Sequence, residues 1–233
     1  MKNTRNYPLL LISQFLGALG DNVILAIILG PVMKSFADGK ITSQEQSIAN
    51  IFYTSLLFVP YLLCASLAGY VNDRFPKTRW LALGNAVKLA GSALAAMHAG
   101  AGEWALAAGY FVVGVGACFY SPAKYGILTE YLPHPKLVVA NGWIEGLTIM
   151  SIILGVLLGG QLVGDRVSHV LLSFDLPLFD TGIETAPEAA IASIVGLYVL
   201  AALFNLRIPR TEAPLQPFAH SLMGLVRDFS SCN

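Results

Sequence analysis

Six long apolar stretches constrain this 233-residue chain more than any other feature of its sequence. The hydrocarbon core of a bilayer is about 30 Å thick, so a helix needs roughly 20 apolar residues to cross it. The stretches reach that length without the polar and apolar alternation over about ten residues that is typical of barrel strands. They predict an all-α membrane protein with transmembrane helices at about residues 8–33, 48–71, 80–98, 104–128, 138–164 and 187–206.

The composition supports a membrane protein and argues against nucleic-acid binding. Hydrophobic residues make up 55% of the chain and charged residues only 12%, whereas a soluble domain carries roughly 25% charged residues. The 14 basic residues balance the 14 acidic ones, so the chain has no net positive field of the kind that attracts nucleic acid. We therefore expect membrane lipids, and no nucleic acid, among its partners.

The distribution of Lys and Arg predicts that both termini are cytoplasmic, because cytoplasmic connections of membrane proteins are enriched in these residues. In that orientation the inner segments hold nine basic residues and the outer segments three. The inner ones are Lys2, Arg5, Arg74, Lys77, Arg79, Lys136, Arg207, Arg210 and Arg227, and the outer ones are Lys34, Lys40 and Arg166. We expect residues 1–206 to form a six-helix bundle and the proline-containing segment 207–233 to be a cytoplasmic linker of a truncated, longer protein.

Four ionisable residues fall inside the expected spans, namely Asp21, Lys88, Lys124 and Glu145. A charge at membrane depth costs roughly 2.5–3.5 kcal/mol on insertion scales, so each one needs a reason. Together with Asn22 they are the candidate substrate-binding residues of a polar cavity that holds a charged head group or relays an ion. The alternative is a set of structural ion pairs that fix the register of the helices, in which Lys88 and Glu145 could pair with each other.

Glycines four residues apart recur in the fifth span, at Gly142 and Gly146, at Gly155 and Gly159, and at Gly160 and Gly164. Small residues at this spacing share one face of a helix and allow a neighbouring backbone to come close. The spacing therefore predicts tight helix packing in this span. The alternative is a smooth face along which helices slide during transport.

The loop after the second span contains Gly69, Asp73, Arg74, Lys77 and Arg79. An acidic residue at the C-terminal end of a helix opposes the helix dipole unless basic residues compensate it. The loop is therefore either a basic cytoplasmic anchor with one local ion pair, or a gating loop whose charges open and close with a transporter. The sequence holds no phosphate-binding glycine loop and no G-x-S-x-G element, so we predict no enzyme activity, no cofactor and no metal.

The same loop resembles the signature loop of the major facilitator superfamily, usually written G-x3-D-R-x-G-R-R/K, with Pro76 here in place of the second glycine. Within that superfamily the chain is similar to the bacterial lysophospholipid transporters. The segments that carry the resemblance are Gln14–Asn22, Gly84–Gly91, Tyr120–Leu128 and Lys136–Glu145.

The resemblance implies the N-terminal six-helix half of a two-bundle fold that works by alternating access. It implies transport of lysophosphatidylethanolamine-type lipids across a bacterial inner membrane, with Asp21, Asn22 and Lys124 along the head-group path and Asp73 with Arg74 in the latch. The implied partners are a missing C-terminal half or a second copy of the chain, and an acyltransferase. Two alternatives remain, a proton-coupled transporter of small solutes or drugs and an inactive membrane fragment.

Overall fold

The structure is a computed structural model that describes residues 6–97, 102–163 and 186–209. Within these ranges the chain forms six helices and no strand. The helices are α1 (Tyr7–Ala37), α2 (Ser43–Arg74), α3 (Lys77–Ala96), α5 (Glu103–Tyr131), α6 (His134–Val163) and α8 (Ala186–Leu206). The expected all-α fold with six helices is thus confirmed, while the expected linker lies outside the described residues beyond position 209.

Short turns with clear sequence signals join α1 to α2 and α2 to α3. Asp38 follows α1, and Gly39 then adopts a φ of 71° that favours glycine. Thr42 and Glu45 form a reciprocal capping box at the start of α2, in which each side chain bonds the other residue's backbone N–H. At the other end of α2 the chain becomes extended at Phe75, directly before Pro76, because a residue that precedes proline avoids the helical region.

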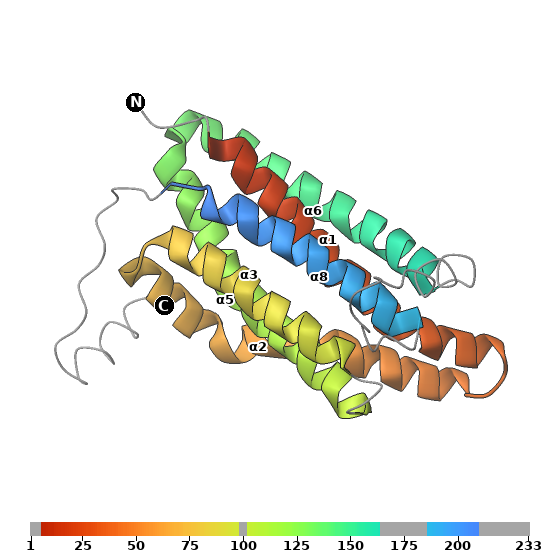
Figure 1. The fold of residues 1–233 in the computed structure, drawn as a ribbon. Helices are drawn as coiled ribbons and strands as arrows, with labels where there is room; N and C mark the ends of the chain where they lie inside the picture. The colour runs from red at the N-terminus through yellow and green to blue at the C-terminus, as the bar shows by residue number, and fades with distance from the viewer. Residues whose placement is uncertain (1–5, 98–101, 164–185, 210–233) are drawn as a thin grey trace, which may run out of the picture.

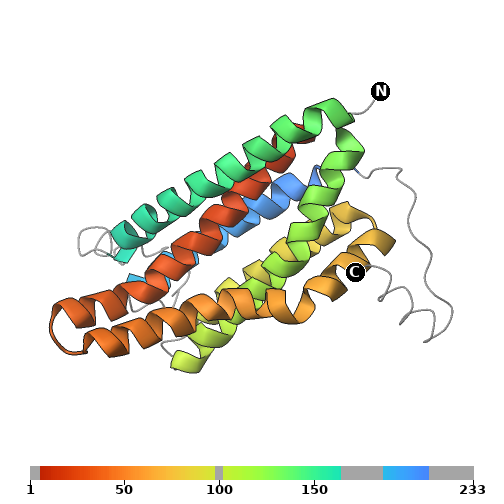
Figure 2. The ribbon, with the colours of Figure 1, turned by 180° about the vertical axis from the view of Figure 1, so that it is seen from behind.

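The helices form an elongated bundle in which α8 lies between α1 and α3, and α6 and α2 lie on its outside (Figures 1 and 2). The tightest pairs are α3 with α5 and α1 with α6. The start of α1, the end of α8 and the α2–α3 and α5–α6 turns lie at one end of the bundle, opposite the α1–α2 turn (Figure 1). Successive described helices therefore run in alternating directions.

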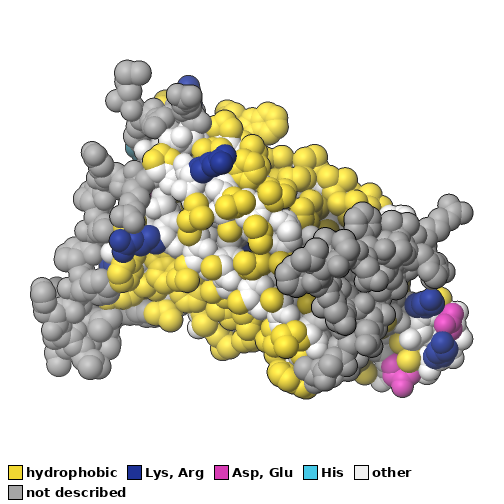
Figure 3. Space-filling view, in the orientation of Figure 1, with side chains coloured by type: hydrophobic (Ala, Val, Ile, Leu, Met, Phe, Trp, Pro, Cys, Tyr) yellow, Lys and Arg dark blue, Asp and Glu magenta, His cyan; other side chains and the backbone are white. Residues whose placement is uncertain are grey.

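The outer surface of the bundle is apolar. Leu62 of α2 and Val138 of α6 are 86% and 81% exposed, and hydrophobic side chains cover the middle of the face seen in Figure 3, with charged ones toward its ends. Among the described residues, four helices (α1, α2, α5 and α6) are long and apolar enough to cross a membrane, and Ser193–Leu206 of α8 forms a shorter apolar helix. A band of this kind excludes water and fits the hydrocarbon core of a bilayer.

Glycines allow the tightest helix contacts, as their spacing predicts for part of the fifth span. A Cβ built on Gly155 or Gly159 of α6 would lie 2.6 or 2.5 Å from side-chain carbons of α1. A Cβ built on Gly142, Gly146 or Gly160 would meet nothing within 4 Å. Tight packing therefore holds for Gly155 and Gly159 and is wrong for the other described glycines of the motif, while Gly164 lies outside the described residues.

Candidate functional site

A buried ion pair joins α1 to α3 in the middle of the bundle. The Lys88 Nζ donates to Asp21 Oδ2 at 2.6 Å, and the two side chains are only 4% and 13% exposed. Tyr198 of α8 donates its hydroxyl to Asp21 Oδ1 at 2.7 Å. Both carboxylate oxygens are thus occupied, and a single acidic residue ties three helices together.

Glycines in α1 and α5 make room for this cluster. A Cβ on Gly20 would lie 2.9 Å from the ring of Tyr198, and one on Gly116 would lie 2.8 Å from Cγ of Lys88. A Cβ on Gly17 would lie 3.8 Å from the Lys88 ammonium. The long side chains of Lys88 and Tyr198 can therefore reach Asp21 because small residues border their paths.

The pairing of the membrane charges differs from the expected one. The alternative in which Lys88 pairs with Glu145 is wrong, because Lys88 binds Asp21 and Glu145 accepts a hydrogen bond from the Tyr125 hydroxyl. The sequence analysis did not single out Tyr198. The sequence feature that could have identified it is a tyrosine in the middle of an apolar span, where the hydroxyl needs a hydrogen-bond partner.

Asn22 faces a different neighbour from Asp21. Its side-chain amide donates to the Ala18 carbonyl one turn earlier, at 2.8 Å. Its Cβ lies against Gly155 of α6, where an added Cβ would come within 2.6 Å. Asn22 therefore belongs to the α1–α6 contact, and the structure does not place it with the Asp21–Lys88 pair.

Lys124 and Glu145 lie on α5 and α6 and are linked through Tyr125. Lys124 is 6% exposed, and its ammonium lies 4.5 Å from the centre of the Tyr125 ring. The Tyr125 hydroxyl donates to Glu145 Oε1, and Glu145 and Asp21 both lie within electrostatic range of Lys124. Within the described part of the chain, Lys124 makes no ion pair at 4 Å or less. A buried ammonium beside an aromatic ring, with no carboxylate in contact, is a group that can bind an anion.

A polar contact between α2 and α5 lies close to Lys124 in the sequence. The hydroxyls of Tyr61 and Ser121 lie 3.2 Å apart, joining α2 to α5 one helical turn from Lys124 and Tyr125. On the α1–α6 side, Gln14 donates its side-chain amide to the Thr148 hydroxyl at 3.2 Å. Hydrogen bonds between polar side chains therefore join α2 to α5 and α1 to α6 in an otherwise apolar bundle.

The residues of the expected gating loop do not form one cluster. Asp73 and Arg79 are exposed, and a Cβ on Gly69 would meet nothing within 4 Å. Arg74 is buried with its guanidinium 3.6 Å from the centre of the Tyr70 ring. Lys77 pairs with Glu130 of α5 at 2.5 Å, a partner that the sequence analysis missed because it lies 53 residues away.

Lys77 reaches Glu130 over a glycine. A Cβ on Gly126 would lie close to the Lys77 side chain and could not coexist with its present path. The pair joins the first turn of α3 to the last turn of α5 at the end of the bundle. Among the residues that the structure describes, no three His, Cys, Asp or Glu side chains gather in a way that could hold a metal ion.

The fold and its membrane-buried charges define a multi-pass helical membrane protein. The family model described as the Major Facilitator Superfamily matches residues 10–229. The chain belongs to this superfamily of membrane transporters.

Among its relatives is the lysophospholipid transporter LplT of Photorhabdus laumondii, which is 32% identical over 228 residues, covering 98% of this chain and 49% of that protein. LplT of Salmonella arizonae is 32% identical over 219 residues, covering 94% of this chain and 47% of the relative. The chain therefore spans about half the length of the curated relatives it matches.

Two solved structures share the fold. One is the crystal structure of a bacterial homologue of the human lysosomal transporter Spinster, in an inward-facing and unoccupied conformation. It matches with a TM-score of 0.67 and 17% identity, over 99% of this chain and 50% of that one. The other is the D-xylose–proton symporter, with a TM-score of 0.58 and 14% identity, over 97% of this chain and 51% of that one. In both cases the six-helix bundle corresponds to half of a larger transporter.

Proposed function

We propose that this bundle is the N-terminal half of a lysophospholipid transporter that moves lysophosphatidylethanolamine-type lipids across a bacterial inner membrane by alternating access. The observation that carries the proposal is the arrangement of Lys124, Tyr125 and Glu145. It places a buried cation and an exposed anion on either side of Tyr125 within the expected spans, as a zwitterionic head group requires.

In this proposal Lys124 binds the phosphate of the lysolipid and Glu145 binds its ammonium group. The Lys124 ammonium has no ion-pair partner among the described residues. It can therefore bind a phosphate without first breaking an ion pair with a carboxylate. Glu145 is held only by the Tyr125 hydroxyl among its described contacts, and its residue is exposed on α6. The apolar surfaces of α2 and α6 beside them suit the single acyl chain.

The Asp21–Lys88 pair has a different role in this proposal. Its charges already satisfy each other, and Tyr198 occupies the second carboxylate oxygen. We propose that the pair holds α1, α3 and α8 in register. We assign Asn22 to the packing of α1 on α6. Both termini of the bundle would lie on the cytoplasmic side, where the exposed Asp73 and Arg79 and the Lys77–Glu130 pair are free to form and break gating contacts.

The proposal includes partners beyond this chain. The relatives are about twice as long, and a single bundle offers one wall of a cavity that two bundles enclose. The second wall is a C-terminal six-helix half, or else a second copy of the chain. An acyltransferase that restores the missing acyl chain is the enzyme that such a cargo requires on the cytoplasmic side.

The test is to measure binding of two lysolipids to the full-length protein and its Lys124→Gln and Glu145→Gln variants. Lysophosphatidylethanolamine carries a phosphate and an ammonium, whereas lysophosphatidic acid carries only the phosphate. Lys124→Gln should weaken binding of both by roughly tenfold or more, because a hydrogen bond to a charged group contributes about 1.5–3 kcal/mol. Glu145→Gln should weaken only lysophosphatidylethanolamine. Lys136→Gln, at an exposed site, should leave both unchanged, and equal affinities in all four proteins would contradict the assignment.

A further inference from the structure

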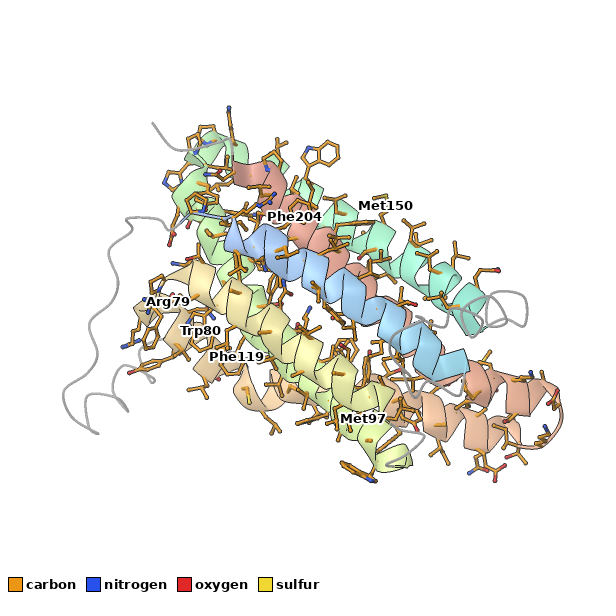
Figure 4. All side chains as sticks on the ribbon, in the orientation of Figure 1. Arg79, Trp80, Met97, Phe119, Met150 and Phe204 are labelled. Atoms are coloured by element: carbon orange, nitrogen blue, oxygen red, sulfur yellow. The ribbon has the colours of Figure 1, made fainter. Side chains whose placement is uncertain are left out.

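A small apolar pocket lies at the outer corner of the bundle where α2 passes into α3. Its volume is about 260 Å³, and it is lined by Val71, Phe75, Arg79, Trp80 and Leu83. Figure 4 shows Arg79 and Trp80 together at this corner, at the end of the bundle that carries the α2–α3 turn. The head-group site around Lys124 uses none of these residues.

Among the basic residues of the signature loop, Arg79 is the one whose side chain has no partner among the described residues. Arg74 lies on the Tyr70 ring and Lys77 is paired with Glu130. Arg79 is exposed and has no ion pair or hydrogen bond among the described side chains. A cation at the rim of an apolar pocket is complementary to an amphipathic anion, with its charge at the rim and its apolar part inside.

Trp80 forms an aromatic wall of the pocket. Its indole N–H is buried and has no hydrogen-bond partner among the described residues. The ring is held firmly, stacked on Phe119 at 5.3 Å between centroids and in edge contact with Phe75 at 6.2 Å. Because the N–H is buried, the ring offers the pocket an apolar face against which an acyl chain can pack.

We propose that this pocket binds an anionic diacyl phospholipid of the cytoplasmic leaflet. Arg79 binds the phosphate, and an acyl chain packs against Trp80, Val71 and Leu83. Basic groups at the cytoplasmic membrane surface attract anionic lipids, and the tryptophan is of the kind enriched at that interface. The inference rests on the orientation given under the proposed function, but not on its cargo.

The test is photo-crosslinking from inside the pocket in the full-length protein. The photoreactive amino acid p-benzoylphenylalanine replaces Leu83, whose side chain is 49% exposed. The protein is placed in phosphatidylethanolamine nanodiscs that contain a trace of radiolabelled phosphatidylglycerol. Unlabelled phosphatidylglycerol should compete with the label, and unlabelled phosphatidylcholine should not. The same probe at Leu62, which is 86% exposed in the middle of α2, should be labelled without regard to head group.

Two variants separate the contributions of the head group and the ring. Arg79→Gln should reduce labelling about fivefold, the contribution of one basic residue near an anionic surface. Trp80→Phe, which keeps the aromatic stack and an apolar wall, should change it little. Lys136→Gln should leave it unchanged. Equal competition by phosphatidylcholine, or undiminished labelling in Arg79→Gln, would overturn the proposal.

Competition with the proposed cargo distinguishes this site from the head-group site. If lysophosphatidylethanolamine displaced the label better than phosphatidylglycerol, the pocket would be part of the substrate path and the proposal would be wrong. If selective labelling persisted in a protein that bound no lysolipid, the phospholipid pocket would be supported and the proposed lysolipid cargo would be contradicted. The two proposals therefore fail in distinguishable ways.

Discussion

Replacing Lys88 with Met tests the energetic role of the ion pair in the middle of the bundle. The substitution removes the 2.6 Å contact with Asp21 and leaves the carboxylate in a site where its side chain is 13% exposed. Removing one partner of a buried pair costs about 3–5 kcal/mol, because an uncompensated charge stays behind. Tyr198 still donates to Asp21 at 2.7 Å, so we expect a loss near the lower end of that range.

The matching double variant makes the prediction specific. Asp21→Asn with Lys88→Met removes both charges and keeps an oxygen that can accept from Tyr198. Replacement of a whole buried pair is often neutral, so the double variant should recover most of the stability that Lys88→Met loses. The free energy of unfolding is measured by SDS titration in mixed micelles with circular dichroism, for all four proteins of the cycle. A Lys88→Met loss below about 0.5 kcal/mol, the size of an ordinary surface change, would refute the reasoning, as would additive losses.

Two further predictions concern packing and the end of the bundle. Gly109→Ala should destabilise the protein by about 1–3 kcal/mol in the same assay, because its Cβ would lie 2.5 Å from backbone atoms of α3. Gly146→Ala, with nothing within 4 Å, should be neutral or stabilising by about 0.4–1 kcal/mol, and equal effects at the two glycines would contradict the packing. Lys77→Met should cost about 1.5–3 kcal/mol, since it removes a charged hydrogen bond from the largely buried Glu130. Lys40→Met, in an ion pair whose lysine is 69% exposed, should cost at most about 1 kcal/mol, so a Lys77 effect no larger than this would count against a structural role.

The helices could be predicted from the sequence because each one is encoded by its own apolar stretch. The pairing of charges could not, because it depends on which helices are neighbours. Asp21 contacts Lys88 and Tyr198, which are 67 and 177 residues away. No local pattern in the sequence shows which helices are neighbours, so the alternative Lys88–Glu145 pair assigned each charge to the wrong partner.

Helical geometry explains why adjacent candidate residues have different surroundings. Successive residues of a helix are about 100° apart around its axis. Asp21 therefore faces α3 and α8 while Asn22 faces α6. Lys77 and Arg79 are separated by about 200° in the first turn of α3, so one meets Glu130 and the other lines the outer pocket. Grouping such residues by their closeness in sequence predicted a single gating cluster that the structure divides.

The most direct test of the proposed function is uptake of labelled lysophosphatidylethanolamine into spheroplasts that express the full-length protein or the 233-residue chain alone. Membrane insertion of both forms is verified first. We expect uptake by the full-length protein and none by the six-helix bundle, since one bundle supplies only one wall of the cavity. Uptake by the bundle alone would mean that copies of it assemble into the transporter. Absence of uptake by an inserted full-length protein would contradict the lysophospholipid assignment.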